Sequence, residues 1–164
     1  MDNIYHVKKL ENIGEIKVQV PGSKSITNRA LLLAALSGEK CRLRGVLFSD
    51  DSRAFLESLI RLGFQVDIKE EAKEVTVRGT GGKIPDTHGK INVRSAGTAA
   101  RFLTVMLALA GGEYELDASP QMCRRPMEPL LHILQEAGVR FAFQGEEGHF
   151  PFTMRSPAGG FAQE

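Results

Sequence analysis

The sequence has 164 residues, 42% of them hydrophobic, which is enough for one domain with a buried core or for two small ones that share an interface. Its 21 basic and 20 acidic residues are spread along the chain and leave a net charge of +1. This balance argues against broad binding of nucleic acid or of an anionic membrane. Cys41 and Cys123 lack the spacing of a disulfide framework or a zinc site, so we interpret them as reduced thiols. With no signal sequence and no apolar run of bilayer length, we expect a soluble cytoplasmic protein.

The first half of the chain alternates strands with helices. Residues 30–36 are apolar on every side, which predicts a helix that is covered all round. Ser49 or Asp50 caps a second helix, whose single apolar face is typical of a helix with one solvated side. The predicted elements are strands near 16–20, 41–47, 66–68 and 75–77, the apolar helix through 30–36, and the amphipathic helix between 50 and 63.

The second half repeats the same order of elements after a glycine-rich linker at 79–85. Its amphipathic helix is predicted to start at Pro126, because proline is favourable at the first helical position. The predicted elements are strands near 91–93, 114–117, 139–143 and 150–154, an apolar helix at 99–110, and the helix from Pro126.

The matching order indicates an internal duplication. Arg29 and Arg101 are separated by the same number of residues as Arg53 and Arg125. A chance alignment within an ordinary α/β chain is the alternative. We place the first repeat at about 18–80 and the second at about 90–158. Apolar helices combined with alternating strands then predict an α/β fold of repeated β-α-β-α-β-β units, with helices packed inside and mixed sheets outside.

The segment from Pro21 to Arg29, Pro-Gly-Ser-Lys-Ser-Ile-Thr-Asn-Arg, has the composition of an anion site at the start of a helix. Gly22 allows a tight turn, and a serine can cap the helix. Lys24 and Arg29 add positive charge to the first-turn N–H groups. Phosphate or carboxylate is the expected ligand. An ordinary helix cap with two solvated cations is the alternative.

The segment from Arg94 to Arg101 holds the corresponding position in the second half. Gly97 allows a ligand to approach the backbone, Thr98 supplies a hydroxyl, and Arg101 lies about one turn further on. The alternatives are a turn glycine at Gly97 and an internal salt bridge at Arg101.

Arg124 and Arg125 precede Pro126 and provide a third cationic helix start. One of the two is a candidate ligand for phosphate or carboxylate, because the guanidinium fork binds such groups at two points. We expect the other to meet solvent. For Arg53, which follows Asp50 and Asp51, we expect a local ion pair.

Together, the motifs Pro21 to Arg29, Ala96 to Arg101 and Arg125-Pro126 resemble the 5-enolpyruvylshikimate-3-phosphate synthase family. The resemblance implies transfer of the enolpyruvyl group of phosphoenolpyruvate to the 5-hydroxyl of shikimate 3-phosphate, in the pathway to chorismate and the aromatic amino acids. It implies no metal, no organic cofactor and inhibition by glyphosate beside Gly97.

The resemblance also assigns roles to individual residues. Lys24 contacts both substrates and is the catalytic candidate, while Ser25 and Arg29 hold shikimate 3-phosphate. Gly97 and Arg125 line the phosphoenolpyruvate pocket. The candidates to support these contacts are Ser95, Thr98 and Arg101.

Three residues depart from the family pattern and bear on individual substrate contacts. Ser95 stands where relatives usually have asparagine, and Gln121 stands where they often have arginine. Phe102 replaces the proline or leucine of many relatives, which bears on the wall of the pocket.

Members of the family are more than twice as long, with two lobes of three units each. We therefore expect an amino-terminal fragment: residues 1–17 give a strand of the absent lobe, and residues 18–164 give part of the substrate-binding lobe. The fragment is expected to be monomeric, to bind shikimate 3-phosphate weakly if at all, and to need the missing carboxy-terminal part for activity. The alternatives are a UDP-N-acetylglucosamine enolpyruvyl transferase and a non-catalytic anion-binding module.

Overall fold

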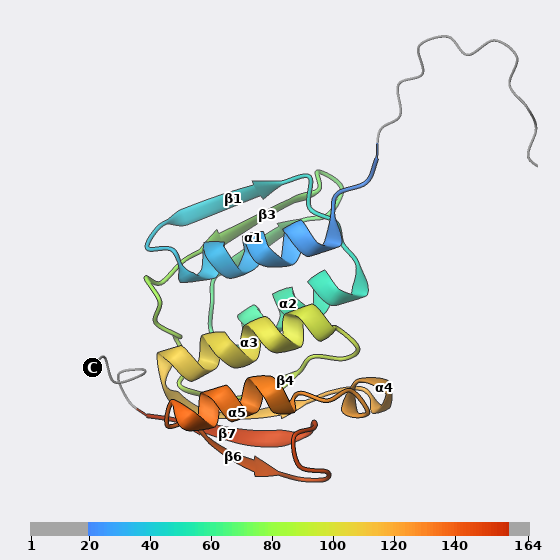
Figure 1. The fold of residues 1–164 in the computed structure, drawn as a ribbon. Helices are drawn as coiled ribbons and strands as arrows, with labels where there is room; N and C mark the ends of the chain where they lie inside the picture. The colour runs from blue at the N-terminus through green and yellow to red at the C-terminus, as the bar shows by residue number, and fades with distance from the viewer. Residues whose placement is uncertain (1–19, 158–164) are drawn as a thin grey trace, which may run out of the picture.

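The structure is a computed structural model that describes residues 20–157. The predicted strand at 16–20 and the segment 1–17 therefore lie outside the described residues, except for Val20, which is exposed. A layer of helices lies between two sheets, as the sequence predicts (Figure 1). None of the described helices is long and apolar enough to cross a bilayer.

The first sheet has three antiparallel strands in the order β1-β3-β2. Apolar and polar residues alternate along its strands, so that Val75 and Val77 of the central strand face the helices and are fully buried. The strands predicted near 66–68 and 75–77 are confirmed and form an antiparallel hairpin. The elements of this half are α1 (Lys24–Leu36), β1 (Lys40–Arg44), α2 (Asp50–Arg61), β2 (Val66–Lys69) and β3 (Glu74–Arg78).

The second sheet has four strands in the order β4-β5-β7-β6. The pair β4 and β5 is parallel, with α3 as the crossover, and the other pairs are antiparallel. The elements of this half are β4 (His88–Asn92), α3 (Gly97–Ala110), β5 (Gly112–Asp117), α4 (Pro120–Cys123), α5 (Glu128–Glu136), β6 (Arg140–Phe143) and β7 (Phe152–Ser156).

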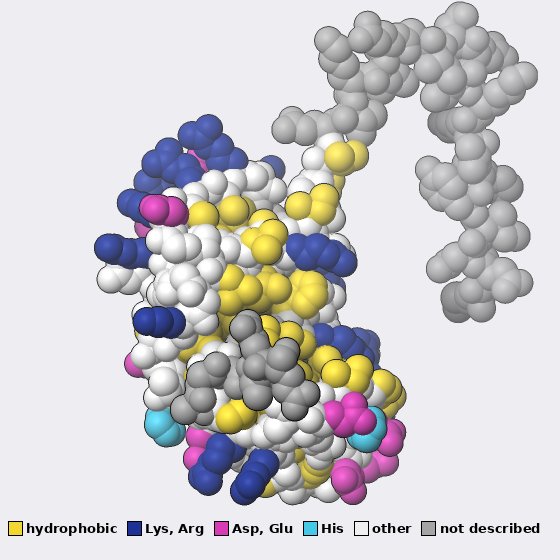
Figure 2. Space-filling view, turned by 60° about the vertical axis from the view of Figure 1, so that its left-hand side comes forward, with side chains coloured by type: hydrophobic (Ala, Val, Ile, Leu, Met, Phe, Trp, Pro, Cys, Tyr) yellow, Lys and Arg dark blue, Asp and Glu magenta, His cyan; other side chains and the backbone are white. Residues whose placement is uncertain are grey.

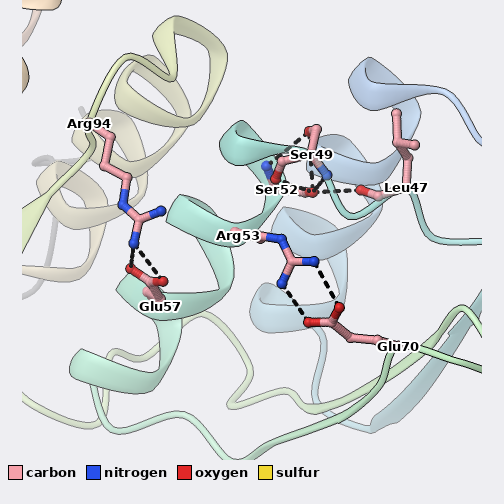
Figure 3. A network of polar contacts seen from close by, with 7 residues as sticks. All are labelled: Leu47, Ser49, Ser52, Arg53, Glu57, Glu70 and Arg94. Atoms are coloured by element: carbon pink, nitrogen blue, oxygen red, sulfur yellow. Dashed lines mark hydrogen bonds and ion pairs between the residues drawn. The ribbon is translucent and has the colours of Figure 1, made fainter.

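Of the two predicted caps of α2, Ser49 and Asp50, the structure has Ser49. Its hydroxyl accepts from the Ser52 backbone N–H at 3.4 Å, and the Ser52 hydroxyl accepts from the Ser49 N–H at 2.8 Å (Figure 3). This reciprocal arrangement is a capping box. The Ser52 hydroxyl also contacts the Leu47 carbonyl oxygen at 2.5 Å, which ties the helix to the chain that leads into it.

The helix that follows Arg125 starts later than predicted. Ser119 caps an extra turn, α4, and α5 begins at Glu128 with a proline in its own first turn. Pro126 lies between the two helices and is not a helical residue. The prediction was wrong because Pro129 can occupy the first turn as well as Pro126 can, and the sequence does not rank the two.

The prediction that both apolar helices are covered on all sides was also wrong. Ile26 and Leu33 of α1 are each 68% exposed, and Leu109 of α3 is 47% exposed. Their opposite faces fill the core, where Leu31 and Leu103 are fully buried. Each helix therefore packs against the described part of the chain with one side only.

Tyr114 of β5 is fully buried and shares its hydroxyl proton between the carbonyl oxygens of Gly111, at 3.0 Å, and Asp86, at 3.3 Å. Burial, and secondarily the charge of Asp86, raises the pKa of the phenol from 10.0 to about 12. The unfolded chain therefore releases this proton before the folded chain does.

We predict that stability contributed by this phenol is fully present below pH 10 and is lost as the pH rises to about 12. Tyr114→Phe should cost about 0.5–1.5 kcal/mol at pH 8 and should make the decline above pH 10 shallower. Urea unfolding of both proteins across this range measures the difference. An equally steep decline in the variant would contradict the prediction.

Candidate functional site

Four helices begin at the same end of the molecule. Figure 1 shows the amino-terminal ends of α1, α2, α3 and α5 on its right-hand side. The first-turn N–H groups of a helix carry partial positive charge, so this end of the structure favours anions. The predicted site residues lie here, in or beside the first turns of α1 and α3 and in the connection between α4 and α5.

The backbone of Leu47 joins the starts of α1 and α2. Its N–H donates to the Thr27 hydroxyl at 3.2 Å, and its carbonyl oxygen contacts the Ser52 hydroxyl. Gly22 lies against the same segment, because a Cβ there would be 2.3 Å from the Gly45 carbonyl oxygen. Gly22 is not among the glycines with positive φ, so this close approach, rather than the predicted tight turn, is what requires glycine.

Ser23, not Ser25, caps α1, and its hydroxyl accepts from the Ile26 N–H at 3.4 Å. Lys24 is the next residue, and its Nζ lies 2.9 Å from an Asp51 carboxylate oxygen in the first turn of α2. The Lys24 side chain is half exposed, whereas that of Asp51 is 13% exposed. The ammonium has three donors, so it can keep this contact and still donate to an anion.

Ser25 is exposed in the first turn of α1, and Arg29 is exposed about one turn further on. An Arg29 Nη donates to the Ser25 carbonyl oxygen at 3.1 Å. The guanidinium carbon lies 5.8 Å from the centre of the Phe102 ring on α3. Arg29 therefore connects the first predicted motif to the second.

Gly97, Arg101 and Arg125 converge at the start of α3. A Cβ at Gly97 would lie 3.4 Å from an Nη of each arginine, so both guanidinium groups lie against this position. Arg101 donates to the Gly97 carbonyl oxygen at 3.1 Å and to that of Pro126 at 3.3 Å. Within residues 20–157 it has no ion pair, so the internal salt bridge considered from the sequence is not formed. Arg101 therefore holds the segment that carries Arg125, between α4 and α5, against α3.

Residues before α3 have structural partners. The hydroxyls of Ser95 and Ser119 are 2.7 Å apart, which links the start of α3 to that of α4. Thr98 is half buried in the first turn of α3. Arg94 has a positive φ of 52° and directs its guanidinium to Glu57 on α2, at 2.7 Å (Figure 3).

Arg53 does not pair with the neighbouring aspartates. It forms a two-point contact with Glu70 in the turn of the β2–β3 hairpin, at 2.5 and 2.7 Å (Figure 3). The hydrogen bonds lower the pKa of the Glu70 carboxyl and raise the pKa of the guanidinium. The predicted local pair was wrong because Asp50 and Asp51 lie in the first turn of the same helix, where Asp51 instead meets Lys24.

Sequence reasoning missed two residues of this site. Asp51 was interpreted only as a partner of Arg53, and Phe102 only as a change in the pocket wall. Their contacts, with Lys24 and Arg29, join different helices, so only the packing of α1 against α2 and α3 reveals them. Asn28 adds a third feature: it is fully buried, and its side-chain amide has no hydrogen-bond partner within residues 20–157.

The site is an open surface. Lys24, Ser25, Arg29, Arg101 and Arg125 are all exposed. A cavity of about 530 Å³ lies elsewhere, against the first sheet and α2, and none of the predicted site residues lines it. In the described part of the chain, no group of three or more His, Cys, Asp or Glu side chains is placed to hold a metal ion.

Solved structures of enolpyruvyl transferases share this α/β fold. It matches an EPSP synthase from Acinetobacter baumannii with a TM-score of 0.74 and 24% identity, over 85% of this chain and 32% of that chain. It also matches the enolpyruvyl transferase NikO from Streptomyces tendae with a TM-score of 0.52 and 19% identity, over 80% of this chain and 29% of that one.

Sequence comparison gives the family. Residues 9–163 match the family described as EPSP synthase (3-phosphoshikimate 1-carboxyvinyltransferase), and the chain belongs to this family. The 3-phosphoshikimate 1-carboxyvinyltransferase of Trichormus variabilis is 44% identical over 137 residues, which cover 84% of this chain and 32% of the relative. That of Nostoc punctiforme is 40% identical over 162 residues, which cover 99% of this chain and 37% of the relative. The chain thus spans about a third of the length of these relatives.

We predict that Gly22→Ala destabilises the protein by about 1–3 kcal/mol, because the new methyl group forces the start of α1 away from the Gly45 carbonyl. Gly38→Ala is the matched control: it follows α1, and nothing lies within 4 Å of its added Cβ. Urea unfolding should show no loss for the control. Equal losses in the two variants would contradict the role given to this contact.

Proposed function

We propose that this chain is the substrate-binding portion of an enzyme that transfers the enolpyruvyl group of phosphoenolpyruvate to the 5-hydroxyl of shikimate 3-phosphate. The observation that carries the proposal is the meeting of the family's cationic residues at the positive ends of α1 and α3. Both substrates are highly anionic, and a chain with a net charge of +1 needs local cations to bind them.

Each predicted residue has a role that fits its placement. Ser25 and Arg29, exposed together on α1, hold shikimate 3-phosphate. Arg125 binds phosphoenolpyruvate, and Gly97 leaves room for it beside the backbone. Ser95, Thr98 and Arg101 support that pocket, and Arg101 does so by fixing the connection that carries Arg125.

The reaction is an addition followed by an elimination. The 5-hydroxyl loses its proton as its oxygen bonds to C2 of phosphoenolpyruvate, and C3 gains a proton, which gives a tetrahedral ketal. Loss of a proton from C3 then expels phosphate from C2 and forms the double bond of the enol ether. Lys24 neutralises both substrates and holds them in reacting geometry, and its ammonium is the group in this chain that can move a proton at the site.

We propose that the remainder of a full-length enzyme completes the site, so that the 164-residue chain is inactive alone. The open site supports this proposal. Figure 2 shows hydrophobic side chains gathered in a band on one face, and Ile26, Leu33 and Leu109 are among the large exposed ones. A solvated apolar surface of this kind is typical of an interaction surface. We place the enzyme in the cytoplasm and take it to be a monomer.

The two halves support the proposed duplication into units of about 18–80 and 90–158. The first sheet has the order β1-β3-β2, and three strands of the second follow the equivalent order β5-β7-β6. Each half also places one helix ahead of the first of these strands and another after it. The sequence predicts the counterpart of β4 near 16–20, a segment that lies outside the described residues except for Val20.

A UDP-N-acetylglucosamine enolpyruvyl transferase fits less well. Its first motif resembles Gly-Ala-Lys-Asn rather than the Gly-Ser-Lys-Ser found here, and its loop cysteine lies further upstream of Arg-Pro. Cys123 is half buried, its thiol lies 3.7 Å from the Ala118 carbonyl oxygen, and burial raises the pKa of that thiol. A raised pKa leaves less of the nucleophilic thiolate.

A chimera tests the function. This chain should replace the matching amino-terminal part of the Nostoc punctiforme relative, and phosphate release should be measured with each substrate alone and with both. We expect turnover only with both substrates, and a loss of about 100-fold or more in the Lys24→Ala chimera. Lys83→Ala, an exposed lysine in the connection between the halves, is the control and should keep full activity.

The same assay separates the alternatives. Turnover by the 164-residue chain alone would contradict the proposal that the remainder is needed. A chimera that binds shikimate 3-phosphate but never releases phosphate would favour a non-catalytic anion-binding module. A chimera that prefers UDP-N-acetylglucosamine as the acceptor would favour the other transferase.

A further inference from the structure

We propose that Phe102 is a positioning residue that fixes the Arg29 guanidinium for a phosphate monoester. The inference rests on the proposed function, since it assigns Arg29 to shikimate 3-phosphate. Arg29 lies on α1 and Phe102 on α3, and the guanidinium carbon is 5.8 Å from the ring centre. This distance is within the range of a cation–π contact.

Arg29 needs such a contact because it is exposed. A free arginine side chain samples many rotamers, and binding an anion requires it to give up that freedom. Within residues 20–157 its only hydrogen bond is the one from Nη1 to the Ser25 carbonyl oxygen. One bond at one edge leaves the plane of the guanidinium free to turn. The Phe102 ring beneath the guanidinium carbon limits that freedom.

The contact does not compete with the ligand. The guanidinium carbon lies over the ring, and a cation–π contact uses the charge of the group and none of its N–H donors. With Nη1 bonded to Ser25, the remaining donors stay available for an anion. Phe102 therefore orients Arg29 without using the groups that bind the anion.

Phe102 can orient Arg29 because it is itself held. It is half buried and packs against the core, and its neighbour Leu103 is fully buried. The residue before it, Arg101, contacts the carbonyl oxygens of Gly97 and Pro126. The ring thus ties Arg29 of α1 to the helix that carries the other predicted pocket. The proline or leucine of many relatives has no aromatic face and cannot form this contact.

Phe102→Leu and Phe102→Tyr in the chimera with the Nostoc punctiforme relative test the proposal, because leucine removes the aromatic ring and tyrosine keeps it. Two quantities are measured by NMR: the ring-current shift of the Arg29 side-chain protons, and the Kd for shikimate 3-phosphate from a titration. Leucine should abolish the shift and raise Kd about two- to five-fold, and tyrosine should change neither. In an Arg29→Met background, Phe102→Leu should have no further effect on Kd.

The outcomes are separable. Binding that is indifferent to Phe102→Leu, or weakened equally by it in the Arg29→Met background, would overturn the inference and leave the proposed function standing. Loss of affinity in the tyrosine variant as well would indicate a packing effect and would also overturn it. A chimera that shows the ring-current shift but binds no shikimate 3-phosphate would overturn the proposed function of this segment, and the positioning role with it.

Discussion

The peptide of Leu47 is the constraint on which the site depends. Its N–H donates to the Thr27 hydroxyl of α1, and its carbonyl oxygen accepts from the Ser52 hydroxyl of α2. The starts of the two helices are therefore held by the backbone of one residue. Gly22 permits this arrangement by allowing the backbones to approach. As a result, Lys24 and Asp51 form an ion pair although they lie on different helices. The position of the Lys24 ammonium is therefore set by how the two helix backbones pack, and not by the lysine side chain alone.

The order of the helices and strands follows from local pattern, because alternation and amphipathic periodicity are properties of short windows. The start of α5 does not, since Pro126 and Pro129 are equally suited to a first turn and the choice depends on Ser119 capping α4. The candidate cations can be predicted from the sequence because they lie beside glycine and serine at helix starts. The roles of Asp51 and Phe102 cannot be predicted in this way, because each contacts a residue that is far away in the sequence.

The described residues cover the helix α1 on one side only. Leu33 and Ile26 of α1 are as exposed as surface residues, although their helix was expected to be covered all round. On the buried side, Asn28 has no hydrogen-bond partner within residues 20–157, and a buried amide without one is costly. The same helix thus has apolar side chains in solvent and a polar one in the core. The exposed apolar face of α1 supports the proposal that the remainder of a full-length enzyme packs against it.

The charges at the helix starts lead to a related conclusion about function. Helix dipoles favour acidic residues in the first turn and basic residues in the last, and α2 follows this rule with Asp50, Asp51 and Arg61. In contrast, α1 and α3 have no acidic residue in the first turn, and α1 begins with Lys24. A cation there is repelled by the helix end, so its placement costs stability unless an anion is near. Asp51 supplies part of that negative charge, and the half-exposed Lys24 has donors left for more. The absence of first-turn acidic residues from α1 and α3, at the same end of the fold, supports the proposed binding of anionic substrates.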